Sequence, residues 1–499
     1  MYLDKNAARM RKIDMERAEI LLIAISLKQD YILTKYYYRL PSLGIGYLAA
    51  VLEKKGIGVS LIDRTISKGE VSSLAHEIVA KRPRVAGFYC ISETYKTVVE
   101  IVKIIKDKDP SIVTMIGGPH VYGMPEESMA DSAIDYGFRG EAEDEILHFL
   151  NALGSASGFE NVQGLVYRRD GRVMMNPLAL VKDLDSIPFP ARHLYPPLGM
   201  YRPSILAYKR LPATGILTSR GCAHRCIFCH SGKGHFKLRF HSAGYVLDEM
   251  MLLKKDFGIR ELIIFDDTFL IDKERARKVC EGMIERHLDM TWSCNARIND
   301  LDKDLLVLLK KAGCWLVQLG IESGNQKILD GIKKGITLEE AQKACRIAYE
   351  AGLQVKAYFI LGHPGETVET LNDTISFMKR IPAHYASINF MTPFPGTQLW
   401  EDVQKYGHFD KKKLEAINYL SDKPTFVPYG LTEEILMKKF QEAYLQFYLN
   451  PKTILRNIGA LRDMESFKKI GIAGKILGAM ALSRMTSRKK ADEKCPKVL

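Results

Sequence analysis

Apolar runs alternate with helical patterns along most of this chain, and no other feature restricts the fold as strongly. Runs of this kind that are continuous are typical of strands in a parallel sheet whose two faces are both covered by helices. In the first part of the chain they occur at 21–27, 59–63, 85–90, 113–118 and, more weakly, 135–139. Residues 19–154 are therefore predicted to form one doubly wound, Rossmann-like α/β domain, preceded by a polar leader at 1–18.

The alternation of strand and helix patterns stops between residues 155 and 205, where glycines and prolines cluster. We expect a short hairpin followed by a linker there. Alternation resumes over residues 206–405. Strands are expected at 215–218, 261–265, 291–295, 316–321, 354–361 and 387–391. Such strand–helix steps suit a partial TIM barrel, whose site lies at the carboxyl ends of the strands. Residues 406–499 are predicted to be mainly helical and to end in a basic tail.

Three of the nine cysteines lie close together after the first strand of the predicted barrel, at Cys222, Cys226 and Cys229. Thiolates are soft ligands that favour iron–sulfur clusters and zinc. Structural zinc sites usually have four protein ligands, whereas three thiolates on a cubane leave one iron open. A zinc site completed by His224 or His230 is the alternative. The other cysteines are scattered, so a disulfide framework is not expected and a reducing compartment is.

With Phe228 in front of the third cysteine, this segment resembles the CxxxCxxC signature of the radical SAM superfamily. The resemblance implies a [4Fe–4S] cluster on Cys222, Cys226 and Cys229, with S-adenosylmethionine (SAM) on the open iron. It implies reductive cleavage of SAM to a 5′-deoxyadenosyl radical. It also implies a cofactor contact by Phe228 and a one-electron donor such as flavodoxin or ferredoxin.

Polar residues and a glycine follow the later barrel strands and are candidates for binding SAM or substrate. They are Asp266, Asp267, Arg297, Glu322 and Gly362. The resemblance implies that one aspartate meets the SAM amino group, while Arg297 can clamp the carboxylate. Each has a structural alternative: the aspartates can cap a helix, Arg297 can form a surface ion pair, and Gly362 can belong to a tight turn.

Three segments of the first domain resemble the branch of the superfamily with an N-terminal cobalamin (B12)-binding domain. They are PSLGIGYLAA at 41–50, IGGPH at 116–120 and RGEAE at 139–143. The resemblance implies a cobalamin-binding type of Rossmann-like domain. It also implies cofactor contacts at the strand ends from Ser42, Leu43, Gly117, Gly118 and Gly140.

Two details of this domain leave alternatives open. Gly44 and Gly46 match a GxGxxA dinucleotide fingerprint, but no strand is expected to run directly into Gly44, as that fingerprint requires. Many cobalamin-binding domains carry D-x-H-x-x-G, whose histidine ligates cobalt. Here Thr65 stands at the histidine position, so the lower cobalt ligand is open, with His120 as a candidate.

The resemblance implies a cobalamin-dependent radical SAM methyltransferase that acts on an unactivated carbon of a small-molecule or lipid-like substrate. One alternative is an oxidative cyclase or rearrangement enzyme of tetrapyrrole or lipid metabolism. A methylthiotransferase acting on tRNA or protein is a remote alternative, because such relatives carry three cysteines in their first domain and this chain has only Cys90 there. The third alternative is a non-enzymatic protein that binds zinc or nucleic acid.

The formal charge is +13, which suits nucleic acid, anionic lipid or a phosphate-bearing cofactor. No nucleic-acid partner is expected from the motifs. From Arg456 onward there are 11 Lys or Arg against 4 Asp or Glu, and residues 467–482 are apolar with interleaved lysines. That segment suits either peripheral membrane contact or packing on the barrel. We expect a cytoplasmic protein, because no signal core and no run near the ~20 residues of a membrane span is present.

Overall fold

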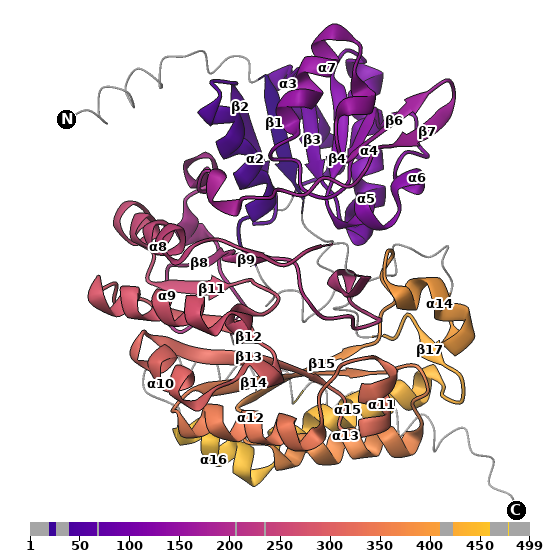
Figure 1. The fold of residues 1–499 in the computed structure, drawn as a ribbon. Coiled ribbons are helices and arrows are strands. Elements are labelled where there is room, and N and C mark those ends of the chain that lie inside the picture. Colours follow the sequence, from indigo (N-terminus) through magenta and orange to yellow (C-terminus); the bar gives the residue numbers. More distant parts are fainter. Residues whose placement is uncertain are drawn as a thin grey trace, which may run out of the picture.

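The computed structural model describes most of the chain. The described residues are 19–25, 39–66, 69–204, 207–233, 236–409, 423–459 and Gly478. The predicted leader at 1–18 and, apart from Gly478, the apolar basic segment at 467–482 lie outside them. Two large sheets of mainly parallel strands, one after the other along the chain, organise the described part (Figure 1).

The first sheet has seven strands in the order β2-β1-β3-β4-β5-β6-β7. They are β1 (Ile20–Ala24), β2 (Val59–Asp63), β3 (Val85–Tyr89), β4 (Val113–Gly117), β5 (Tyr136–Phe138), β6 (Leu165–Arg169) and β7 (Arg172–Met175). Strands β1 to β5 run parallel, and the hairpin β6–β7 pairs antiparallel with β5. The hairpin therefore extends the sheet beyond the region of strand–helix alternation, because the edge of β5 offers backbone groups for pairing.

Helices cover both faces of this sheet. They are α2 (Leu43–Lys54), α3 (Val71–Lys81), α4 (Tyr95–Lys108), α5 (Pro119–Gly123), α6 (Pro125–Ser128) and α7 (Ile146–Ser155). Alternate residues of β1 enter two separate cores: Ile20 and Leu22 pack on the side of α2 and α7, while Leu21 and Ile23 pack on the side of α3 and α4. Burial on both faces explains the continuous apolar run in the sequence. The predicted doubly wound domain is confirmed.

The second sheet is the predicted partial barrel, with six parallel strands in the order β15-β14-β13-β12-β11-β8. The strands are β8 (Ala213–Ile216), β11 (Glu261–Ile264), β12 (Thr291–Ala296), β13 (Cys314–Glu322), β14 (Gln354–Leu361) and β15 (Tyr385–Phe390). The helices between them are α8 (Ala243–Phe257), α9 (Lys273–Glu285), α10 (Lys303–Lys311), α11 (Gln326–Gly331), α12 (Leu338–Glu350) and α13 (Val368–Arg380). A short antiparallel ribbon, β9 (Ser219–Arg220) and β10 (Arg239–Phe240), follows β8.

Helix α15 (Glu433–Tyr448) covers the open edge of the barrel at β15. The Tyr448 hydroxyl accepts from the Ala386 amide (3.2 Å) and donates to the Ala386 carbonyl (3.0 Å). Tyr444 makes the same two contacts with Ile388, both at 3.3 Å. The tyrosines thus satisfy backbone groups that an edge strand leaves unpaired.

The remaining elements of the described C-terminal region are short. They are α14 (Gln398–Tyr406), the ribbon of β16 (Gly407–His408) and β17 (Val427–Pro428), and α16 (Pro451–Gly459). Within the described part of the chain, no helix has both the length and the apolar character needed to cross a membrane.

Candidate active site

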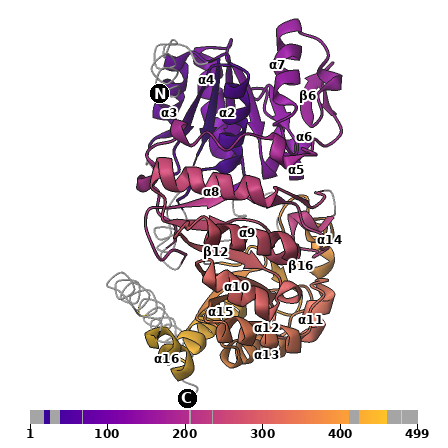
Figure 2. The ribbon, with the colours of Figure 1, turned by 60° about the vertical axis from the view of Figure 1, so that its left-hand side comes forward.

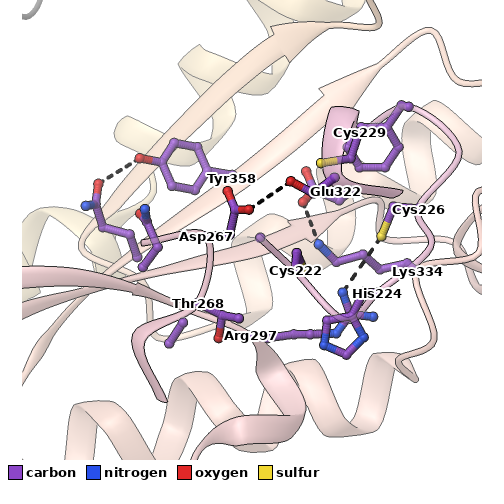
Figure 3. A pocket seen from close by; sticks show the side chains of 16 residues that line it. Cys222, His224, Cys226, Cys229, Asp267, Thr268, Arg297, Glu322, Lys334 and Tyr358 are labelled. Atoms are coloured by element: carbon purple, nitrogen blue, oxygen red, sulfur yellow. Dashed lines mark hydrogen bonds and ion pairs between the residues drawn. The ribbon is translucent and has the colours of Figure 1, made fainter. Parts of the chain in front are cut away.

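The three clustered cysteines line one cavity of about 200 Å³ at the strand ends of the barrel (Figure 3). The loop that carries them begins at Gly221, whose φ is +85°. A Cβ at Gly221 would lie 2.5 Å from the Lys237 carbonyl oxygen, so a side chain does not fit where the loop leaves the β9–β10 ribbon. Phe228 also lines the cavity, between Cys226 and Cys229 in the chain.

The two aspartates after β11 have different surroundings. Asp266 is fully buried and accepts hydrogen bonds from the Thr218 amide (2.6 Å), the Thr218 hydroxyl (2.5 Å) and the Ser219 hydroxyl (2.6 Å). It therefore fixes the start of the cysteine loop and is not among the residues that line the cavity. Asp267 lines the cavity and accepts from the Ser231 hydroxyl at 2.9 Å. Burial raises the pKa of Asp267.

Two cationic side chains reach the cavity beside the thiols. Arg297 is buried, and its Nη1 lies 3.8 Å from Cys226 Sγ. Its Nε has no hydrogen-bond partner among the described residues. Lys334 Nζ lies 2.7 Å from Glu322 Oε1, and both side chains are nearly buried (Figure 3). Buried polar atoms that lack full pairing are what a polar ligand would complete.

Glu322 has an unusual backbone conformation at the end of β13. Its φ is +75°, and the pairing register with β14 shifts between Gly320 and Glu322. A Cβ at Gly320 would lie 2.5 Å from Glu322 Oε1 and 2.9 Å from Lys334 Nζ. The absent side chain leaves room for the ion pair. Left-handed backbone at a residue other than glycine, next to a bulge, is a form of strain that gathers at functional sites.

Gly362 lies in the turn after β14, with φ +90°, and does not line the cavity. Its amide donates to Glu366 Oε2 at 2.5 Å, and the amide of His363 donates to the same oxygen at 3.0 Å. Burial raises the pKa of Glu366 to about 8. His363 is buried as well, donates from Nε2 to the Glu322 carbonyl oxygen (3.3 Å), and lies edge-on to Phe228 with the ring centres 6.3 Å apart. The turn therefore braces both Phe228 and Glu322.

His224, inside the cysteine segment, also lines the cavity. Several other cavity residues carry no motif that the sequence reveals. They are Ser231, Thr268, Asn295, Ala296, Gln318, Gly320, Lys334 and Tyr358. Lys334 is the most consequential, because a buried lysine in a cavity carries charge to a ligand. In the sequence it is one of two adjacent lysines, Lys333 and Lys334, and only the fold distinguishes the exposed one from the buried one.

The glycines expected to contact cobalamin lie at strand ends of the first sheet. Gly118 has φ +110°, and a Cβ there would lie 2.7 Å from the Cys90 carbonyl oxygen. Gly140 has φ +88°, and a Cβ there would lie 2.3 Å from the Ala179 carbonyl oxygen. Both positions require glycine for backbone packing. At Gly117, at the end of β4, a Cβ would meet no atom closer than 3.9 Å.

Ser42 and Leu43 begin helix α2 beside the linker. The carbonyl of Ser42 accepts a hydrogen bond from the Tyr195 hydroxyl. Leu43 is buried and packs in a small core with residues of the linker segment. Packing in that core accounts for Leu43. The Ser42 side chain, in contrast, is only half-buried.

No imidazole stands at the place where the D-x-H-x-x-G pattern would put one. Asp63 is buried and accepts from the Thr65 amide (2.8 Å) and the Tyr201 hydroxyl (2.9 Å). His120 is fully buried, and its ring stacks on Tyr95 with the centres 4.2 Å apart. Burial lowers the pKa of His120 to about 4, so its ring is neutral at pH 7. The packing of His120 makes it part of the domain core.

Ion pairs join the RGEAE segment of the first domain to the ribbon that leads into the cysteine loop. Arg220 Nη2 lies 2.7 Å from Glu143 Oε1, and Arg239 Nη2 lies 2.7 Å from Glu141 Oε1. Arg220 Nη1 lies 3.6 Å from Glu141. All four side chains are largely buried. The two glutamates thus contact the cluster-bearing half of the molecule.

A second contact joins the same two edges. The ring of Tyr122, in α5, lies 5.4 Å from that of His230, next to Cys229. Gly123 packs so closely on the turn after β15 that a Cβ would lie 2.5 Å from the Pro395 carbonyl oxygen. The strand-end loops of the first sheet therefore contact the strand-end loops of the barrel, as the stacked arrangement of the two sheets in Figures 1 and 2 shows.

Two family descriptions match this chain. Residues 216–378 match the radical SAM superfamily, and residues 30–150 match the B12 binding domain. The first range includes the cysteine loop and all the barrel strand ends that carry the candidates above, and the second includes strands β2 to β5 of the first sheet.

Characterised and uncharacterised relatives cover most of the chain. An uncharacterized methyltransferase of Pyrococcus horikoshii is 32% identical over 424 residues, which is 84% of this chain and 90% of that protein. Cytidylyl-2-hydroxyethylphosphonate methyltransferase of Streptomyces wedmorensis is 29% identical, over 74% of this chain and 79% of that protein. An anaerobic magnesium-protoporphyrin IX monomethyl ester cyclase of Rubrivivax gelatinosus is 27% identical, over 82% and 74%.

Solved structures share the whole fold. The radical SAM methyltransferase TsrM from Kitasatospora setae, with cobalamin and a [4Fe–4S] cluster bound, superposes with a TM-score of 0.67 at 17% identity, over 94% of this chain and all of that one. The cobalamin-dependent SAM radical enzyme OxsB, with aqua-cobalamin and SAM bound, gives 0.72 at 16% identity, over 93% of this chain and 72% of that one.

Proposed function

This chain belongs to the radical SAM superfamily, in the branch with a B12-binding domain, and on that premise we propose that it methylates an unactivated carbon of a small-molecule or lipid-like substrate. It is an enzyme, as its relatives are. One observation supports the proposal above the others. Three thiols, two carboxylates and two cations line a single cavity, and the ribbon that leads into the loop with the thiols contacts the B12-binding domain.

The donor set of the cavity fits a [4Fe–4S] cluster with SAM beside it. Cys222, Cys226 and Cys229 would hold such a cluster with three thiolates and leave one iron for SAM. When bound, the cluster would supply the electron for reductive cleavage of SAM, and cobalamin would supply a carrier for the methyl group. Phe228, braced by His363, lines the cavity beside the thiols.

The charged side chains of the cavity suit the two ends of the SAM amino-acid group. Arg297 and Lys334 present positive charge, which suits a carboxylate. Asp267 and Glu322 present carboxylates, which suit an ammonium group and hydroxyl groups. We assign Asp267 to ligand binding and Asp266 to holding the cysteine loop, because the oxygens of Asp266 are already used by Thr218 and Ser219.

Cobalamin is proposed at the carboxyl edge of the first sheet, near Ser42 and Gly117, with Gly118 and Gly140 shaping the loops. The first domain contains three histidines, His76, His120 and His148. His76 and His148 lie on exposed helix surfaces, and His120 is in the core. The residues therefore fit a cofactor whose cobalt has no imidazole from the protein. The cobalt EPR spectrum of the bound cofactor should then lack splitting from a protein nitrogen, and such splitting would contradict this assignment.

The proposal is tested with anaerobic protein reconstituted with iron, sulfide and cobalamin. A one-electron donor, such as reduced flavodoxin or ferredoxin, and SAM with a deuterated methyl group are then added. We expect 5′-deoxyadenosine in the mixture, and deuterated methyl groups in a small molecule when cell extract is supplied. Protein with an intact cluster that forms no 5′-deoxyadenosine would exclude the radical reaction. The Cys222→Ser protein, treated in the same way, is the negative control.

Oxidative ring formation or rearrangement is a second candidate, which the similarity to the Rubrivivax gelatinosus cyclase supports. The same assay distinguishes this candidate from a methyltransferase. A cyclase forms 5′-deoxyadenosine with no deuterated methyl group in the product, whereas a methyltransferase transfers the label.

A further inference from the structure

Helix α16 packs on the end of the barrel with its polar side inward. Thr453 is buried. Arg456 donates from Nη1 to the Ala383 carbonyl oxygen at 2.5 Å, and its guanidinium lies 5.7 Å from the centre of the Tyr349 ring. Asn457 donates from Nδ2 to the His384 carbonyl oxygen at 3.0 Å. The contacts with the protein are therefore made by a threonine, an arginine and an asparagine.

The apolar side of the same helix faces outward. The exposed fractions are 41% for Ile454, 69% for Leu455 and 55% for Ile458, and Leu449, just before the helix, is 59% exposed. Positions i, i+1 and i+4 form one stripe on a helix. A surface helix of a globular protein normally buries such a stripe, and gathered exposed apolar side chains mark interaction sites. In α16 this orientation is reversed.

The charge of the sequence that follows α16 indicates the kind of partner. Residues 460–499, which follow α16 directly, contain ten Lys or Arg and four Asp or Glu, a net charge of +6. Lysines are interleaved with apolar residues at 467–482. An exposed apolar stripe whose chain continues into a strongly basic sequence suits a surface that is both apolar and negative, and a bilayer with anionic head groups is such a surface.

We propose that the outward stripe of α16, formed by Ile454, Leu455 and Ile458, docks this enzyme on an anionic phospholipid membrane, together with the exposed Leu449 just before the helix. The helix lies on the bilayer and does not cross it, in keeping with its length of 9 residues. In Figures 1 and 2 α16 lies at the end of the molecule opposite the first sheet, so docking leaves the contact between the two sheets free. The proposal does not depend on which reaction the cavity performs.

The test is sedimentation of the full chain with vesicles. Vesicles of equal parts phosphatidylglycerol and phosphatidylcholine are compared with vesicles of phosphatidylcholine alone, at low and high salt. We expect binding to the anionic vesicles that salt weakens. The double variant Leu455→Glu/Ile458→Glu should bind them roughly tenfold or more weakly, because it puts carboxylates on the docking stripe. Met200→Glu, at a side chain that is 61% exposed in another part of the chain, should bind like the wild type.

Four results would overturn the proposal. The first is an absence of vesicle binding, and the second is equal, salt-insensitive binding to both kinds of vesicle. The third is a dimer in sedimentation velocity that the double variant abolishes while vesicle binding is unchanged, which would make a second copy of the chain the occupant. The fourth is a lower melting temperature of the double variant with unchanged vesicle binding, which would indicate that the chain's own C-terminal segment covers the stripe.

Discussion

Arg220 and Glu143 form a largely buried ion pair, with Nη2 and Oε1 2.7 Å apart, that joins the start of the cysteine loop to the B12-binding domain. The two residues are 77 positions apart in the chain. Arg220 stands two residues before Cys222, and its guanidinium also lies over the ring of Tyr47 in α2, 5.0 Å from the ring centre. The Arg220 side chain, at the start of the cysteine loop, therefore contacts two residues of the B12-binding domain.

Glu143→Gln should lower the free energy of unfolding by about 1–3 kcal/mol, because it leaves the buried Arg220 with a weaker partner. It should also lower the iron retained after gel filtration, since Arg220 would hold the cysteine loop less firmly. Urea unfolding and iron analysis measure the two effects. Glu160→Gln is the matched control: its pair with Arg169, at 4.0 Å, is exposed on both sides, so about 0–1 kcal/mol is expected. Equal effects of the two variants would contradict the bridging role.

Cys222→Ser should abolish the brown colour and the stoichiometric iron of the reconstituted protein, because a hydroxyl is a poor ligand for a cluster that has only three protein thiolates. Cys280→Ala is the control, at a buried cysteine of α9 outside the cavity. Its iron content should equal that of the wild type. A variant at Cys222 that keeps full iron would exclude this residue as a ligand.

Lys334→Met should weaken SAM binding roughly 10- to 100-fold, the range expected when a hydrogen bond to a charged group is removed. Equilibrium dialysis of reconstituted protein with SAM measures the change. Lys333→Met is the matched control, because Lys333 is adjacent in the chain and exposed. If the two variants bind SAM equally well, Lys334 serves only the ion pair with Glu322.

Gly320→Ala should also weaken SAM binding, by displacing the pair of Glu322 and Lys334 into the cavity. The added Cβ would lie 2.5 Å from one partner and 2.9 Å from the other. Both are ends of flexible side chains, so they can move and the melting temperature should change little. Gly331→Ala adds a Cβ with no atom within 4 Å and should leave binding unchanged. A large loss of stability without loss of SAM affinity would contradict this expectation.

Glu366 should make the stability of the protein fall as pH rises. Its pKa is about 8 in the folded chain and about 4.3 in an unfolded one, so between these values the folded state holds a proton that the unfolded state has lost. The contribution is present in full below the unfolded pKa and declines by up to about 1.4 kcal/mol per pH unit through the folded pKa.

Glu366→Gln removes this titration. Urea unfolding of both proteins between pH 5 and pH 9 gives the difference in unfolding free energy, which should shift in favour of the variant as pH rises to about 8 and then level off. Subtracting the unfolding free energy of one protein from that of the other cancels the contributions of the other titratable groups, including the buried His363. A difference that stays constant over the range would show that Glu366 does not hold the proton.

Much of this architecture could be read from local patterns. Strands buried on both faces are continuous apolar runs wherever they occur, and helices between them imply parallel pairing. The thiols of Cys222, Cys226 and Cys229 come together because they lie on one short loop. The same holds for the turn at Gly362 and Glu366, whose partners are four residues apart.

The two α/β units and the cysteine loop could thus be predicted from the amino-acid sequence, since they depend on neighbours in the chain. Three features follow from the folded arrangement alone: Asp267 and not Asp266 faces the cavity, Lys334 is buried against Glu322, and Glu143 pairs with Arg220. Side-chain direction at a strand end, and the partner of a buried charge, depend on how separate strands pair and on how two sheets meet. No spacing along the chain encodes those distances.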